Sequence, residues 1–200
     1  MRNRNVALAL ALLAVALAAG CRKKEPARTA EWTPEPPRGS RDWNIQNARS
    51  AAPPSVSMAS RVMIWPEDSL VAEEVVPGVG GWTCVPDDPR TPADDPVCRD
   101  DQSLSWYQAL RTHRPPVLTG MAIAYRLKGG NTASDSDPYK MIPDSGQQWI
   151  TDPPTIEIAI SADHNDVIYR GLPTTRTEHG PWIKWAKTPY AVIVMPASGR

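Results

Sequence analysis

Cysteine is the residue whose chemistry depends most on spacing, and two of the three cysteines, Cys84 and Cys98, lie close together in CVPDDPRTPADDPVC. Thirteen residues separate them, so they do not form the C-x-x-C pattern of thioredoxin-like redox pairs. The segment between them contains no histidine, and a zinc site would need two further ligands. Their role therefore depends on where the third cysteine, Cys21, lies and which compartment the chain enters.

Cys21 follows a segment with the features of an export signal. Two arginines precede an apolar run at residues 6–19, which is shorter than the roughly 20 residues that span a bilayer. Residues 17–21, LAAGC, resemble the lipobox of bacterial lipoproteins, in which the cysteine is acylated and becomes the new N-terminus. Ala18 stands where such signals usually carry leucine. The resemblance implies lipidation of Cys21; the alternative is an ordinary signal peptide and a free thiol.

The remainder of the chain divides by composition. Residues 21–43 are rich in charge and proline and cannot bury enough apolar surface to fold, which predicts a flexible tether. The predicted organisation is a signal peptide at 1–20, a lipid-anchored tether at 21–43 and one domain at 44–200. Lipoproteins kept at the inner membrane usually carry Asp after the cysteine, whereas this chain has Arg22. The resemblance thus implies an outer-membrane lipoprotein that faces the periplasm, with the membrane as a partner through its lipid anchor.

With Cys21 acylated in an oxidising compartment, a disulfide between Cys84 and Cys98 is expected. Closing a loop of about 15 residues stabilises a fold by roughly 3 kcal/mol in the chain-entropy account. We therefore predict that this disulfide is structural.

Aspartates in and beside this loop offer a second chemistry. There are six of them between residues 87 and 101, and Ca²⁺ takes six to eight oxygen ligands. The alternative is that each aspartate caps a turn or the next helix while four prolines fix the loop. The candidate metal ligands are Asp87, Asp95, Asp135 and Asp137. Ca²⁺ is the one cofactor considered, and no other is expected.

The richest polar segment is GGNTASDSDPY at residues 129–139, which follows an apolar run. Loops held by a rigid scaffold are common places for binding sites, so this segment is the first choice for a ligand site. Its candidate ligand-binding residues are Asn131, Thr132, Ser134, Asp135 and Asp137. The alternative is a turn built from local Asx and Ser/Thr hydrogen bonds.

Hydrophobic period and proline positions predict the elements that would hold these residues. Helices are expected at 44–52 and 102–113, the second with Asp100 at its start and two prolines after its end. Strands are expected at 61–65, 69–76, 117–127, 155–161 and 190–195. The predicted fold is a single α+β domain with a mostly antiparallel sheet, one clear helix and long Pro-rich loops.

Six segments together resemble a family of uncharacterised secreted and lipoprotein bacterial proteins. They are SAAPPSVSMASRVMIWP (50–66), GWTCVPDDPRTPADDPVC (81–98), SWYQALRTHRPP (105–116), AYRLKGGNTASDSDPY (124–139), QWITDPP (148–154) and PWIKWAKTPYAVIVMP (181–196). The shared pattern is a GWTC-x-PD-x-P…DP-x-C loop followed by AY-x-L-x-GG-x-x-AS-x-x-DP. It implies one architecture that contains the disulfide loop, and no activity. Thr155 and Val192 stand where similar chains look to carry histidine, so no histidine chemistry is carried over.

The usual signatures of enzymes are absent: the sequence has no G-x-S-x-G, H-E-x-x-H, phosphate loop or C-x-x-C-H motif. Its histidines, His113, His164 and His179, lie at a helix end or in polar loops. No basic patch indicates nucleic acid as a partner. The sequence predicts a non-enzymatic binding or structural domain of the cell envelope, with an envelope protein or a small ligand as partner. The alternative is a small envelope hydrolase or transferase that uses loop Ser, His and Asp residues.

Overall fold

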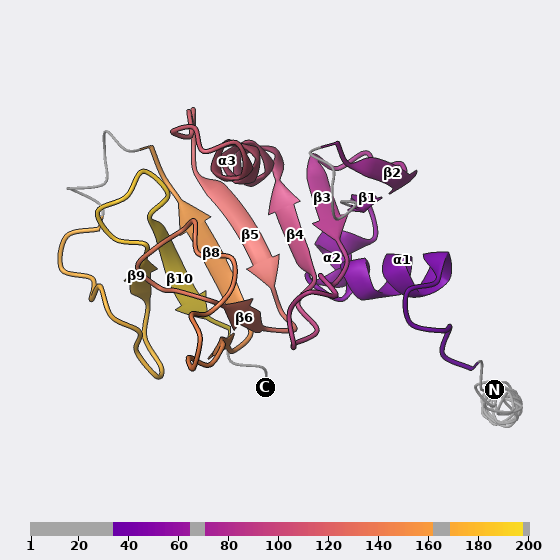
Figure 1. Ribbon diagram of the computed structural model, residues 1–200. Coiled ribbons are helices and arrows are strands. Elements are labelled where there is room, and N and C mark those ends of the chain that lie inside the picture. The colour runs from indigo at the N-terminus through magenta and orange to yellow at the C-terminus, as the bar shows by residue number, and fades with distance from the viewer. Residues whose placement is uncertain (1–33, 65–70, 162–168, 198–200) are drawn as a thin grey trace, which may run out of the picture. The chain divides into compact units, whose positions relative to one another are not determined.

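A single mixed sheet forms the centre of the fold, which the computed structural model describes for residues 34–64, 71–161 and 169–197 (Figure 1). Its strands are β1 (Arg61–Ile64), β2 (Glu73–Val76), β3 (Trp82–Val85), β4 (Val97–Asp100), β5 (Ala122–Arg126), β8 (Thr155–Ala159), β9 (Trp182–Lys184) and β10 (Val192–Pro196). Their order is β2-β1-β3-β4-β5-β8-β10-β9. Every neighbouring pair is antiparallel except β1 with β3. The predicted α+β domain with a mostly antiparallel sheet is confirmed.

Short elements complete the fold. The helices are α1 (Arg41–Arg49), α2 (Pro54–Ser57) and α3 (Asp101–Arg111), and β6 (Gly130–Thr132) pairs with β7 (Ile150–Asp152) in a separate antiparallel ribbon. Within the described ranges, no helix has the length and apolar character needed to cross a membrane.

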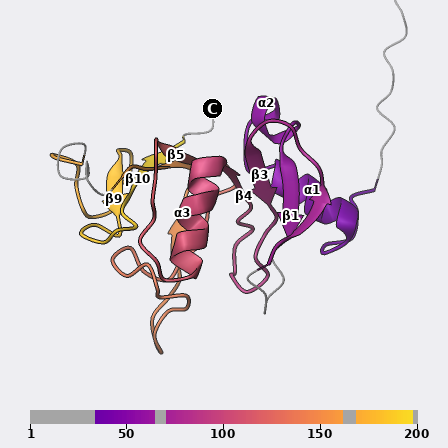
Figure 2. The same ribbon diagram turned by 90° about the horizontal axis from the view of Figure 1, so that it is seen from above.

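Helices α1 and α3 pack on opposite faces of the sheet. Successive strand residues point to opposite faces, and β4 shows both. The Cys98 sulfur lies 3.6 Å from the carbonyl oxygen of Ala48 in α1, whereas Arg99 Nη1 donates to the hydroxyl of Ser103 in α3 at 3.4 Å. Figure 2 shows α3 standing in front of the central strands and α1 beside β1 and β3. The α3 face is the one that carries the candidate site described below.

Side-chain caps explain where the two longer helices begin. The Ser40 hydroxyl accepts the backbone N–H of Trp43, so α1 starts three residues inside the segment predicted as tether. Asp100 caps α3 by accepting the N–H of Ser103, and its second oxygen accepts the N–H of Ile123 in β5. One carboxylate thus starts α3 and also fixes it to the sheet.

The predicted elements are found with shifted bounds. The run at 117–127 forms a strand only in its second half, because the first half is a loop in which Val117 is exposed. Strands β3, β4, β6, β7 and β9 and helix α2 were not predicted. Each has only three or four residues, which is too short for a hydrophobic period to be read. Residues 65 and 69–70 of the predicted strands lie outside the described residues.

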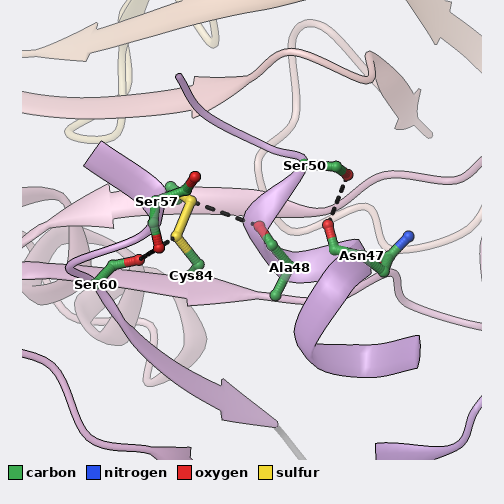
Figure 3. Close-up of a disulfide and its surroundings, with 7 residues drawn as sticks. Asn47, Ala48, Ser50, Ser57, Ser60 and Cys84 are labelled. Carbon is green, nitrogen blue, oxygen red and sulfur yellow. Dashed lines mark hydrogen bonds between the residues drawn. A yellow bond between two sulfur atoms is a disulfide. The ribbon is translucent and has the colours of Figure 1, made fainter. Parts of the chain in front are cut away.

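The disulfide between Cys84 and Cys98 is confirmed (Figure 3). The two residues face each other directly in the β3–β4 register, with their Cα atoms 4.0 Å apart. Both side chains are fully buried beneath α1, and the Ser60 hydroxyl, which donates to the carbonyl of Ser57, lies 2.9 Å from the Cys84 sulfur. The bond therefore fastens two neighbouring strands at the centre of one hydrophobic cluster.

Gly78 is placed where β1 leaves no room for a side chain. A Cβ atom at this position would lie 2.0 Å from the backbone nitrogen of Arg61. Nearby Gly80 differs, because its Cβ would lie 3.6 Å from the nearest atom, the Cβ of Ala59.

Gly78→Ala is expected to lower the free energy of unfolding by about 1 to 3 kcal/mol, because the backbone of β1 must shift to admit the methyl group. Gly80→Ala is the matched control and is expected to change stability by less than about 1 kcal/mol. Urea unfolding of both variants checks this, and equal midpoints for the two would contradict the close packing at Gly78.

Candidate ligand-binding site

The strand register places charged residues on either side of the small residue Ala124, on the face of the sheet that α3 covers. Arg99 in β4 pairs with Ala124 in β5, and Ala124 pairs with Glu157 in β8, so the three lie in one row across the sheet. Arg126 follows two residues after Ala124 and therefore shares its face.

A cavity of about 420 Å³ lies above this row. Its walls come from the sheet, from α3 and from two loops, residues 86–91 and 131–149. The lining residues that matter here are Arg99, Trp106, Arg126, Asn131, Trp149 and Glu157. Small-molecule sites commonly have volumes of about 300–1,000 Å³, and they combine apolar walls with a few placed polar groups.

Polar groups in this cavity wall are short of hydrogen bonds. Arg99 is 5% exposed and Glu157 8% exposed. Three buried donors have no acceptor: Nε of Arg99, Nε of Arg126 and the indole N–H of Trp106. One buried acceptor, Asn131 Oδ1, has no donor. Within the part of the chain that the structure describes, Glu157 has no hydrogen bond and no cation within ion-pair distance. Buried polar groups in native proteins are nearly always paired, so this concentration of unpaired groups in one cavity indicates a site for a polar ligand.

The two arginines are stabilised mainly by charge and by an aromatic ring. Burial holds the pKa of Arg99 below its ordinary value, although Glu157 acts in the opposite direction, and its guanidinium lies 4.4 Å from the centre of the Tyr107 ring. Burial also lowers the pKa of Arg126, but the charges of Glu157 and Asp95 outweigh it and raise that pKa. Both groups stay charged at neutral pH, because the ordinary pKa of arginine is about 12.5 or higher.

Aromatic rings form the other part of the wall. Trp106 of α3 stacks on Trp185 with ring centres 5.9 Å apart, and Lys184 Nζ lies 5.0 Å from the centre of the Trp185 ring. Trp149 is half-buried and, among the residues described, contacts no other aromatic ring. Its indole is therefore a candidate aromatic surface for a ligand.

The disulfide loop closes one side of the cavity through Asp87 and Asp95. Asp87 pairs with Arg38 at 2.6 Å and also accepts the N–H of Asp95 at 3.1 Å. Asp95 accepts the N–H of Asp88 and the Thr91 hydroxyl, and lies 3.6 Å from Arg126. Burial raises the pKa of Asp95 to about 6.

Asp95→Asn is expected to change how stability depends on pH. The folded pKa of about 6 lies above the ordinary value near 3.9, so the folded protein holds this proton more tightly than the unfolded chain does. Wild-type stability relative to the variant is therefore highest below pH 4 and falls as pH rises to about 6. The fall should be on the order of 2 to 3 kcal/mol, because the pKa differs by about two units between the folded and unfolded states and each unit corresponds to about 1.4 kcal/mol. Melting temperatures of both proteins between pH 4 and 8 check this, and parallel curves would contradict it.

A second charged cluster supports the opposite end of the cavity. Asp152 lies 3.3 Å from Lys184 Nζ and 2.6 Å from Arg176 Nη2, and Arg176 also pairs with Asp135 at 2.9 Å. Burial tends to raise the pKa of the Asp152 carboxyl, but the charges of Lys184, Arg176 and Arg126 outweigh it and hold that pKa below its ordinary value. This cluster joins the β6–β7 ribbon to the end of the sheet.

The carboxylates considered as cation ligands do not converge. In the disulfide loop, Asp87 pairs with Arg38 and Asp95 pairs with Arg126, two arginines from outside the loop. Asp135 pairs with Arg176, and Asp137 accepts the N–H of Tyr139. No group of three or more His, Cys, Asp or Glu that could hold a metal ion occurs in the described ranges. The alternative interpretation, that the aspartates fix turns, fits Asp137, whereas Asp87, Asp95 and Asp135 form ion pairs with arginines.

The predicted ligand segment divides into two parts. Asn131 and Thr132 line the cavity. Ser134 and Asp137 form a local turn instead, in which the Ser134 hydroxyl accepts the N–H of Asp137, and Asp135 belongs to the Arg176 ion pair. Of the predicted ligand-binding residues, only Asn131 and Thr132, at the start of the segment, line the cavity.

The histidines give no support to a catalytic triad in the described residues. His113 is exposed at the end of α3 with its ring 4.3 Å from that of Tyr139, and His179 is exposed beside Glu178. His164 lies outside the described residues.

The sequence analysis did not identify Arg99, Arg126 and Glu157. One signal was available for Glu157, which stands in the middle of the otherwise apolar strand TIEIA, in phase with the buried Thr155 and Ala159. A charged residue at an inward-facing strand position is unusual and marks a possible site.

Comparisons of the chain with protein-family models, with curated proteins and with solved structures give no match. The resemblance of its six segments to secreted bacterial proteins thus stays a prediction. The geometry of the cavity is therefore the main indication of function.

Proposed function

We propose that this chain is a lipid-anchored binding protein of the bacterial cell envelope, whose domain holds a small polar ligand in the cavity on the α3 face. The observation that carries the proposal is the set of buried polar atoms without hydrogen-bond partners in that cavity, above all Nε of Arg99 and Nε of Arg126, with the buried residue Glu157 in the same wall. A purely structural domain gains nothing from such groups, because each unpaired one costs about 1 to 3 kcal/mol of stability.

Binding is favoured over catalysis by the same geometry. The hydrolase alternative requires a nucleophile beside a base, and the described histidines lie in exposed positions away from the cavity wall. The groups in the cavity instead provide hydrogen-bond donors, acceptors and aromatic faces, which fix the orientation of a ligand.

The anchor and the location are supported by the sequence. The signal-like segment, the LAAGC pattern at residues 17–21 and the charged, proline-rich stretch that follows favour a domain tethered by an acylated Cys21. Arg22 favours the outer membrane, and the disulfide is in keeping with an oxidising compartment.

Native mass spectrometry of the full-length chain, expressed in a Gram-negative host and released in mild detergent, tests the proposal. We expect acyl mass on Cys21 and a small-molecule adduct that dissociates on activation. Arg126→Gln should reduce the adduct by about tenfold or more, because a charge-assisted hydrogen bond is worth about 1.5 to 3 kcal/mol. Arg61→Gln is the matched control, since Arg61 lies on the same sheet face but outside the cavity and pairs with Asp101.

Two results would contradict the proposal. Unacylated Cys21 would remove the anchor. A chain that carries no adduct, and whose melting temperature is unchanged by a library of sugars, amino acids, nucleosides and organic acids, would remove the binding function.

A further inference from the structure

The polar groups in the cavity wall are of two complementary kinds. The Nε atoms of Arg99 and Arg126 and the Trp106 indole lack acceptors and can only donate hydrogen bonds, whereas Asn131 Oδ1, which lacks a donor, and the Glu157 carboxylate can only accept them. A matching ligand must therefore present acceptors and donors close together. A hydroxyl group does both at once, since it accepts from a guanidinium and donates to a carboxylate.

Around Arg99, Arg126 and Glu157, charge favours a ligand without net charge; elsewhere in the wall, Arg90 pairs with Asp88 and Lys140 with Asp144. The negative charge of Glu157 acts on both Arg99 and Arg126. The negative charge of Asp95 acts on Arg126. Lys184 is already paired with Asp152. An anion would be repelled by Glu157 and a cation by the two arginines, so a neutral, hydroxylated molecule meets the least opposition.

Ring faces in the wall indicate the shape of the ligand. Trp149 and Trp185 line the cavity and are half-buried, so that part of each indole is accessible. A flat aromatic face packs well against the C–H face of a saturated ring, while the hydroxyls at the edge of that ring reach polar side chains. The volume of about 420 Å³ lies near the lower end of the range for small-molecule sites and suits one or two such rings.

We infer that the cavity recognises a neutral saccharide of one or two rings, with Arg99, Arg126 and Glu157 bonding its hydroxyls and Trp149 packing on its ring. This inference rests on the proposed binding function and names its ligand class. Arg99 and Glu157 bond from the strands on either side of Ala124, and Trp149 lines the same cavity.

Saturation-transfer NMR on the oxidised full-length chain tests the inference. The probes are methyl glucoside, methyl galactoside, N-acetylglucosamine, maltose and cellobiose, followed by an array of bacterial envelope glycans. The competing probes are benzoate and lactate as carboxylates and alanyl-alanine as a zwitterion. We expect saturable binding of at least one neutral saccharide, competed by no carboxylate.

Isosteric variants connect the binding to the cavity. Glu157→Gln and Arg126→Gln are expected to weaken saccharide binding by about tenfold or more, and Trp149→Ala by a similar factor. Arg61→Gln should bind as the wild type does. Near-ultraviolet circular dichroism confirms that each variant is folded before it is compared, and Trp149→Phe, which keeps a ring face, should bind better than Trp149→Ala.

The outcomes separate this inference from the function on which it rests. Binding of carboxylates or of the zwitterion with no saccharide bound overturns the ligand class and leaves the binding function standing. Saccharide binding that is unchanged in Glu157→Gln and Arg126→Gln overturns the assignment to this cavity. A chain that binds no probe of any class overturns both.

Discussion

The double variant Cys84→Ala, Cys98→Ala is expected to lose about 3 kcal/mol of stability, because the disulfide closes a loop of about 15 residues and so restricts the unfolded chain. A loss of this size corresponds to a fall in melting temperature of about 6 to 12 °C for a domain of this length. Thermal unfolding of the oxidised wild type and the variant measures it.

Burial makes the effect larger than that of an exposed bond. Both sulfurs are fully buried between β3, β4 and α1, so alanine also removes packed atoms from the cluster around Val62 and Ala48. Wild type unfolded in the presence of reductant is the control and should resemble the variant. Equal melting temperatures of the oxidised wild type and the variant would show that the bond is not structural.

The disulfide also bears on the cavity. Its loop carries Asp95, which lies beside Arg126, so loosening β3 and β4 is expected to weaken ligand binding as well as stability. The two consequences have one cause, which is that the same strands form the hydrophobic cluster on one face and the polar site on the other.

Asp152→Asn is expected to cost about 3 to 5 kcal/mol, the usual result of breaking a buried ion pair on one side. The reason lies in Lys184, which is 3% exposed and has Asp152 as its ion-pair partner at 3.3 Å. Without that carboxylate, the amine stays buried beside the Trp185 ring and loses its ion-pair partner. Urea unfolding at neutral pH measures the loss.

Asp144→Asn is the matched control, since Asp144 is exposed and its pair with Lys140 is a surface pair. Such pairs contribute about 0 to 1 kcal/mol. Adding Lys184→Met to Asp152→Asn should recover part of the loss, because the unpaired charge is then removed as well. An Asp152→Asn variant no less stable than Asp144→Asn would contradict the proposed role of this pair.

The same ion pair predicts how acid acts on the protein. The pKa of Asp152 lies below its ordinary value in the folded state, so its contribution is complete above the unfolded pKa near 4 and is lost as pH falls through the lower folded pKa. Asp95 acts in the opposite direction, since its raised pKa lets stability fall as pH rises from 4 to about 6. The Asp152→Asn variant should therefore lose less stability than the wild type between pH 4 and 2.

Local features of the sequence determined several parts of the structure. Asp100 and the prolines after residue 114 define α3 to within two residues, because caps and proline act within one turn of a helix. The apolar runs at β8 and β10 were found because their side chains alternate between two buried faces. The disulfide was predicted from the number of cysteines and the expected export of the chain, and the segment that begins at Asn131 was identified by its polar composition.

Only the tertiary structure decided what the charged residues do. Arg99, Arg126 and Glu157 come from three strands, and they meet because β8 pairs with β5 in a register that sets Glu157 beside Ala124. In the same way, Asp135 meets Arg176, a partner 41 residues away. A local pattern fixes which face of a strand a side chain occupies, but the neighbours of that strand depend on long-range pairing that no short segment encodes.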